Sequence, residues 1–393
     1  MPIQQGNDIR RIGTILLVGM VAGAGVRYVA AKAAERAAAN PQSRTLIDWD
    51  LARKVALRVS QTDEHPAQDR ALREAQYRRM VERSEPLIER YMNSRLPEPF
   101  SRVKVMDRRE WLEANFESFK HILDPIEDLY QDIAQRHPTS STMRMLNRQA
   151  VGIQVGVLLG YLARRVLGQY DLSLFSPNPD VSGALYFLEP NISAVQKQLG
   201  VDDEDFRLWI TLHETSHVFQ FESFPWVRGY FHELLGQFLG QVSNQLDSLS
   251  GGINILLDRI MGRQSGDHWM ETLMTQEQRQ VFDKLQALMS LVEGYSNHIM
   301  NAIGSELLPS FEQIENRFKQ RQKNRSLFEE LFNRITGMDL KLAQYRQGEE
   351  FVDAVVAQRD IAFMNRVWEK PDNLPTMDEI RNPARWITRM SAV

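Results

Sequence analysis

The sequence predicts a mainly helical protein with one small β-sheet or hairpin. Apolar residues recur at three- and four-residue spacing through most of the chain, among abundant arginine and glutamate. Residues 184–188 are the one convincing strand candidate, and the sequence contains no internal repeat and no low-complexity tract. The chain has 393 residues, of which 43% are hydrophobic and 25% charged, as is typical of a globular protein.

Helices are expected on both sides of the strand candidate, separated by proline- and glycine-containing breaks. The expected helices before it span 45–60, 67–93, 107–135 and 141–167, and those after it span 205–221, 226–248, 275–303, 318–332 and 340–359. Three prolines predict that the tail from residue 371 is irregular or short-helical.

The strand candidate Ala184–Leu188 combines aliphatic and aromatic side chains and ends before Pro190. It lies shortly before the helix 205–221, where an exposed strand edge could pair with an extended peptide backbone. An internal strand or a short apolar loop is an equally open alternative.

Charge and cysteine content exclude several classes of protein. The net charge is −4 and the pI about 6.1, and no basic stripe is interleaved with aromatic residues, so no nucleic-acid partner is expected. The absence of cysteine excludes disulfides, thiolate ligands and a cysteine nucleophile. Histidine and carboxylate side chains are therefore the available ligands for zinc.

The N-terminal residues 1–40 form a separate apolar segment. The apolar run Ile12–Val26 follows Arg10-Arg11 and is shorter than the about 20 residues of a membrane helix. The segment is predicted to be a buried helix, a signal peptide or an anchor. A cytoplasmic location is expected, with membrane attachment through residues 12–26 or export as the alternative.

The segment His213-Glu214-Thr215-Ser216-His217 is the most informative motif of the chain. In a helix, residues four apart lie on one face, so both imidazoles can reach one ion. Zinc accepts neutral imidazole nitrogen and keeps one position open for water in catalytic sites. The motif therefore predicts Zn²⁺ held by His213 and His217, with Glu214 as the general base for a bound water.

A catalytic zinc site usually has three protein ligands. The variant with a third histidine six residues after His217 is absent. Glu293 is the first choice, because it is a lone carboxylate after the apolar stretch 287–292, where an unpaired charge is expensive to bury. Glu233 and Glu222 are the alternatives, although Glu222 lies five residues past His217 and so points elsewhere.

Further polar residues could stabilise an oxyanion or orient the ligands. Tyr295 and His298 are candidates for a direct catalytic role, although each could equally be a packing or core residue. Asn297 falls one turn after Glu293 and could hold a ligand histidine through its second ring nitrogen. Other candidates for contacts with the ligands or the substrate are Arg228, Tyr230 and His232.

Longer stretches of the sequence form a pattern that runs over roughly residues 45 to 390. They are Asp48–Ala52, Asp107–Trp111 with Asn115, Leu159–Asp171, Tyr186–Asn191, His213–Trp226, Leu291–Gly294, Asp339–Val352, Leu374–Ile380 and Pro383–Trp386. In these stretches the chain resembles a family of bacterial zincin-like hydrolases, some of which are associated with the biosynthesis of a deazaflavin coenzyme.

The resemblance implies a mostly helical zincin-type catalytic unit over residues 41–393, in which two helical lobes could flank a cleft. It places the His-Glu-x-x-His motif on the metal helix and supports Glu293 as the third ligand. It also implies that Tyr170 and Asp171 belong to a wall of the site, where the residues alone indicate a helix end. In such proteins an acidic residue commonly follows the third ligand by one turn, whereas this chain has Asn297.

The leading hypothesis is a zinc-dependent hydrolase of the metallopeptidase type that acts on a peptide or small amide. One alternative is a helical di-iron carboxylate protein, which needs two Glu-x-x-His copies, and the sequence shows no second copy in a plausible helix. The other is a non-catalytic zincin scaffold with structural or absent zinc, in which His232 or Glu233 would replace the water. The sequence does not specify the oligomeric state.

Overall fold

A computed structural model describes residues 45–61, 70–136, 141–170, 183–248, 275–323 and 338–392. Helices dominate these ranges and one three-stranded sheet occurs in them, so the predicted fold class is confirmed. In the first half the elements are α3 (Trp49–Val59), α4 (Arg70–Met92), β1 (Val103–Met106), α5 (Arg108–Arg136), α6 (Ser141–Ala163), β2 (Gly168–Tyr170) and β3 (Leu185–Leu188). The strands β1 and β2 were not predicted, because runs of four and three residues are too short to show a period.

The elements of the second half are α7 (Glu189–Leu199), α8 (Asp203–Val218), a π-helical turn (Phe219–Ser223), α9 (Pro225–Ser248), α12 (Gln276–Leu307), α13 (Phe311–Lys323), α15 (Met338–Gln358), α16 (Ile361–Asn365), α17 (Met377–Arg381) and α18 (Pro383–Ser391), with 3₁₀ turns at Arg366–Trp368 and Pro371–Asn373. Of these, α8, α9, α12, α13 and α15 correspond to the five expected helices with shifted ends, and residues 324–332 of the helix expected at 318–332 lie outside the described residues. Helix α7 was not predicted. Pro190 is tolerated in its first turn, because the N–H that proline lacks would make no hydrogen bond within the helix there.

The sheet has the order β1-β3-β2, with β3 parallel to β1 and antiparallel to β2. Leu185 of β3 pairs with Val103 on one side and with Tyr170 on the other. The strand predicted at 184–188 is therefore internal, and the peptide-binding edge considered for it is contradicted. The strand at the edge of the sheet beside α8 is β2.

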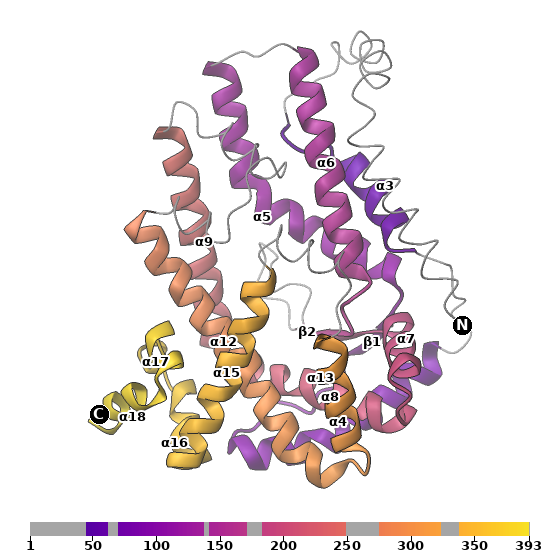
Figure 1. Ribbon diagram of the computed structural model, residues 1–393, viewed down its shortest axis with the longest axis vertical. Helices are drawn as coiled ribbons and strands as arrows, with labels where there is room; N and C mark the ends of the chain where they lie inside the picture. The colour runs from indigo at the N-terminus through magenta and orange to yellow at the C-terminus, as the bar shows by residue number, and fades with distance from the viewer. Residues whose placement is uncertain are drawn as a thin grey trace.

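Glycines let α6 pack directly against α3, since Gly152, Gly156 and Gly160 face the backbone at Asp48, Ala52 and Ala56. A Cβ added at Gly156 would lie 2.4 Å from the carbonyl oxygen of Ala52, so a larger residue would force the helices apart. Figure 1 shows α3, α5 and α6 toward one end of the molecule and α16, α17 and α18 toward the other.

One large apolar core joins α4, α8, α12 and α15 to the sheet. In this core the ring of Tyr77 stacks on Phe187 of β3 with centroids 4.0 Å apart.

None of the helices in the described ranges is long and apolar enough to cross a membrane. The apolar run 12–26, with the alternatives predicted for residues 1–40, lies outside the described residues. The two-lobe arrangement and the cytoplasmic location stay predictions.

Candidate metal centre

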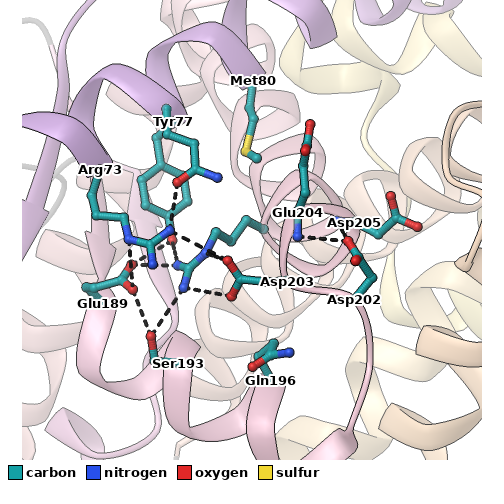
Figure 2. Close-up of polar contacts among 12 residues, drawn as sticks. Arg73, Tyr77, Met80, Glu189, Ser193, Gln196, Asp202, Asp203, Glu204 and Asp205 are labelled. Carbon is teal, nitrogen blue, oxygen red and sulfur yellow. Dashed lines mark hydrogen bonds and ion pairs between the residues drawn. The ribbon is translucent and has the colours of Figure 1, made fainter.

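A buried arginine anchors the first half of α8. Arg207 is 1% exposed, and its guanidinium forms ion pairs with Glu189 at 2.6 Å and Asp203 at 3.0 Å. It also donates hydrogen bonds to the hydroxyls of Tyr77 and Ser193. Figure 2 shows Arg73 of α4 beside the same two carboxylates. These contacts tie α8 to α4 and α7, and so fix the helix that carries the metal motif.

The two histidines of the motif and Glu293 converge on one point. The rings of His213 and His217 are one turn apart on α8, with centroids 4.9 Å apart. Nε2 of His213 lies 3.6 Å from Oε2 of Glu293, and Nε2 of His217 lies 3.9 Å from Oε1. Two ligands that each lie about 2 Å from one zinc ion are at most about 4 Å apart. These two separations fit ligands of one ion, and the three ligand atoms all lie within 4.8 Å of one another.

The group has three potential metal ligands and is partly exposed. Within the described ranges, His213, His217 and Glu293 are the one set of potential ligands that lie close enough together, and no fourth histidine or carboxylate joins them. The side chains of His213 and Glu293 are 21% and 27% exposed. Burial raises the pKa of Glu293, but the contact with His213 and the charges of both histidines outweigh burial and lower it. These contacts thus favour the ionised form of the Glu293 carboxyl group.

The two rival carboxylates have other partners. Glu222 accepts a hydrogen bond from the Tyr170 hydroxyl at 2.7 Å and forms an ion pair with Arg102 at 3.3 Å. Glu233 is exposed and accepts a hydrogen bond from the Gln237 amide at 3.0 Å. Neither belongs to the group of converging ligands.

Glu214 lies against strand β2. Its carboxylate accepts the backbone N–H of Tyr170, and a Cβ added at Gly168 would lie 2.6 Å from its Cγ, Cδ and Oε1. Burial and the charge of Glu293 raise the pKa of Glu214 to about 7, against the opposing effects of His217 and of the Tyr170 N–H. A carboxyl group with this pKa can both accept and donate a proton near neutral pH.

Strand β2 is fixed from both faces. On one face, Gln169 accepts a hydrogen bond from the indole of Trp111 at 2.6 Å. On the other, the buried Tyr170 receives a hydrogen bond from the guanidinium of Arg228 at 3.0 Å. The backbone N–H of Tyr170 thus contacts Glu214. The hydroxyl group of Tyr170 contacts Arg228. Asp171, the other residue expected in this wall, lies outside the described residues.

The structure turns Tyr295 away from the metal group. Its ring is fully buried and packs edge-on against Trp368 at 5.2 Å, and its hydroxyl donates to Oδ1 of Asn365. Tyr295 follows Glu293 by two positions, and this spacing turns the two side chains about 160° apart on a helix. Tyr295 therefore does not face the converging ligands, and its catalytic role stays a prediction.

His298 also lies apart from the ligands. Its two ring nitrogens are 2.7 Å from the Tyr91 hydroxyl and 2.5 Å from Oδ1 of Asp353. Five positions after Glu293, it is turned about 140° away on α12. His298 links α4, α12 and α15, and its catalytic role also stays a prediction.

The remaining predicted residues do not contact the histidine ligands. Tyr230 packs against Trp226, and His232 contacts the ring of Phe231, all on α9. Asn297 does lie one turn after Glu293 and is half-buried. The hydrogen bonds to Nδ1 of His217, however, involve two other residues that sequence reasoning missed, Gln220 and Ser296, at 2.9 and 3.2 Å. Their spacing of three from the ligands His217 and Glu293 was the available signal.

Comparison with known proteins places this site in a family. The model of a zincin-like metallopeptidase family matches residues 47–387, so the chain belongs to that family and the predicted resemblance is confirmed. A solved structure of a proposed hydrolase with a novel fold, from Chloroflexus aurantiacus, is 53% identical to this chain. The match covers 88% of this chain and 99% of that one, with a TM-score of 0.67. No curated protein matches the chain. The family and this structure support a hydrolase, and the family implies a metal, usually zinc.

Proposed function

We propose that the protein is a zinc-dependent peptidase, with His213, His217 and Glu293 as the metal ligands. The proposal rests on one observation, a partly exposed three-ligand group with a buried carboxylate, Glu214, beside it. Two imidazoles and one carboxylate are a donor set that zinc accepts in catalytic sites. Zinc bound there would supply a water of lowered pKa and polarise the carbonyl of the substrate.

Glu214 carries the proton transfers in this proposal. Its carboxylate accepts a proton from the attacking water and later delivers that proton to the leaving nitrogen. The hydrogen bond from the Tyr170 N–H keeps the carboxylate in place on the side of β2. The contact with Gly168 leaves no room for a side chain between Glu214 and the strand.

The sheet favours an extended peptide over a small amide as substrate. In the described residues β2 pairs with β3 alone. Glu214 already takes the backbone N–H of Tyr170, so an added strand would use the remaining backbone groups of this edge. This edge lies next to α8, whereas β3 is paired on both sides. A peptide along β2 would bring its backbone close to Glu214.

The two alternative functions, a structural zinc site and a di-iron site, each require a feature that a catalytic zinc site lacks. A structural zinc site would have a fourth protein ligand, and a di-iron protein would need a second metal group. The described part of the chain contains neither of these features.

The substitution Glu214→Gln tests the mechanism. Purified wild-type and variant proteins are assayed on fluorogenic peptide libraries and on small amides, and their zinc content is measured. We expect the variant to keep zinc and to lose about 10²- to 10⁴-fold in turnover, since the amide cannot accept the proton. Glu222→Gln, which changes a carboxylate held by Tyr170 and Arg102, is the matched control and should stay active. Unchanged turnover in Glu214→Gln would refute the assigned role.

A further inference from the structure

A closed set of hydrogen bonds surrounds the nitrogen of His217 that faces away from Glu293. Nδ1 of His217 lies 2.9 Å from Oε1 of Gln220 and 3.2 Å from Oγ of Ser296. Gln220 and Ser296 are both fully buried. The other ring nitrogen, Nε2, is the one that points to Glu293. Which nitrogen of a neutral His217 carries the proton is therefore decided by the hydrogen-bond partners of Nδ1.

The amide of Gln220 has one workable orientation. Its Nε2 donates to the carbonyl oxygen of Val292 at 2.9 Å and to Oγ of Ser296 at 3.2 Å. The reverse orientation would set the amide oxygen of Gln220 against that carbonyl, with two acceptors and no proton between them. Oε1 of Gln220 must therefore face His217, and Nδ1 has to supply the proton.

Ser296 leads to the same assignment. Its hydroxyl donates its single proton to the carbonyl of Val292 at 3.1 Å. Toward Gln220 and His217 it can then act only as an acceptor. Both neighbours of Nδ1 thus accept, and a neutral imidazole with a proton on Nδ1 has its free lone pair on Nε2. That lone pair is the one a metal would bind.

The backbone places Gln220 where this contact is made. It lies in the π-helical turn Phe219–Ser223, directly after the last residue of α8. Turns of this kind are rare and often occur at functional sites. Val292, whose carbonyl orients the amide, immediately precedes Glu293 on α12. One hydrogen-bond set therefore links the second histidine ligand to the helix that carries the carboxylate ligand.

We propose that Gln220 is a positioning residue, which fixes His217 as the tautomer protonated on Nδ1 and presents Nε2 toward Glu293 before any metal binds. The hydrogen bonds that fix the tautomer do not depend on the proposed zinc site, whereas the effect of the tautomer on metal binding rests on that proposed function. Gln220→Met keeps length and burial but removes both the acceptor and the donor. Gln237→Met, an exposed glutamine on α9, is the matched control for the exchange.

Two measurements test the proposal on full-length protein. Nitrogen chemical shifts of histidine in the metal-free proteins report the tautomer of His217, and competition with a chromogenic chelator gives the Kd for zinc. We expect the Nδ1-protonated form in the wild type and in Gln237→Met, and a mixture of tautomers in Gln220→Met. Zinc affinity should fall about 10- to 100-fold in Gln220→Met alone.

An Nε2-protonated His217 in the wild type, or an unchanged tautomer and zinc Kd in Gln220→Met, would overturn the proposal. If the wild type bound no zinc at all, the proposed function would fail, and the tautomer of His217 would then decide the positioning role by itself. Ser296→Ala gives a second test, since it removes the weaker contact and leaves that of Gln220 in place. It should shift the tautomer and the Kd less than Gln220→Met does.

Discussion

The crossing of α12 and α15 is a backbone contact that a single methyl group should disrupt. Gly294 of α12 faces Gly348 of α15, and a Cβ added at Gly294 would lie 2.2 Å from the carbonyl carbon of Gly348 and 2.4 Å from the nitrogen of Glu349. The nearest ordinary contact distance is 3.4 Å, so the helices would have to separate by about 1 Å. The atoms in the way belong to the backbone and cannot rotate aside.

Gly294→Ala should therefore destabilise the protein and disturb the neighbouring Glu293. Overpacking costs about 1 to 3 kcal/mol, and we expect the upper part of this range because backbone must move. A displacement on the order of 1 Å also exceeds the about 0.2 Å tolerance of metal-ligand distances, so zinc affinity should fall at least about tenfold. Gly236→Ala on α9 is the matched control, because nothing lies within 4 Å of its added Cβ.

Urea unfolding of the metal-free proteins and zinc competition with a chelator measure the two effects separately. Gly236→Ala should leave zinc affinity unchanged and raise stability by about 0.5 to 1 kcal/mol, since alanine favours the helix over glycine. Wild-type stability together with wild-type zinc affinity in Gly294→Ala would refute the argument that this crossing positions Glu293.

Three further predictions address the base, the buried tyrosine and the anchor of α8. Gly168→Ala should displace the carboxylate of Glu214 from β2, so peptide turnover should fall while zinc content stays that of the wild type. Wild-type turnover in Gly168→Ala would contradict the claim that this close contact positions Glu214. Tyr295→Phe should keep zinc and turnover but lower stability in urea by about 0.5 to 1.5 kcal/mol, because the part-buried hydrogen bond to Asn365 is lost, and lost turnover at full stability would support a catalytic role. Burial raises the pKa of Asp203, but Arg207 and Arg73 outweigh it and lower the pKa. Its stabilising contribution is thus present above its unfolded pKa of about 3.9 and is lost as the pH falls through the lower folded value. The stability difference between wild type and Asp203→Asn should therefore shrink between pH 5 and pH 3, and a constant difference would contradict the ion pair.

The fold class and the helix of the His-Glu-x-x-His motif could be predicted because both depend on periodicity. Apolar spacing indicates a long helix, and residues four apart on it share a face. The strand β2 was not predicted because three residues carry no period, yet it contacts Glu214. Its role depends on Gly168 having no side chain, which only the packing of β2 against α8 reveals.

The neighbours of the proposed ligands were harder to predict than the group of His213, His217 and Glu293 itself. Glu293 stood out because a lone carboxylate beside an apolar stretch needs a partner. Tyr295 and His298 are close to it in sequence, but their helical angles turn them toward other elements. Gln220 could be identified only with the carbonyl of Val292 in view, since that contact fixes the direction of its amide.

Zinc content tests the central claim most directly. The wild type, Glu293→Ala and Glu233→Ala are purified without added metal, and zinc per chain is measured by mass spectrometry. We predict about one zinc per chain in the wild type and in Glu233→Ala, and none in Glu293→Ala. Zinc retained in Glu293→Ala, or no zinc in the wild type even after it is added, would contradict the site of two histidines and one glutamate.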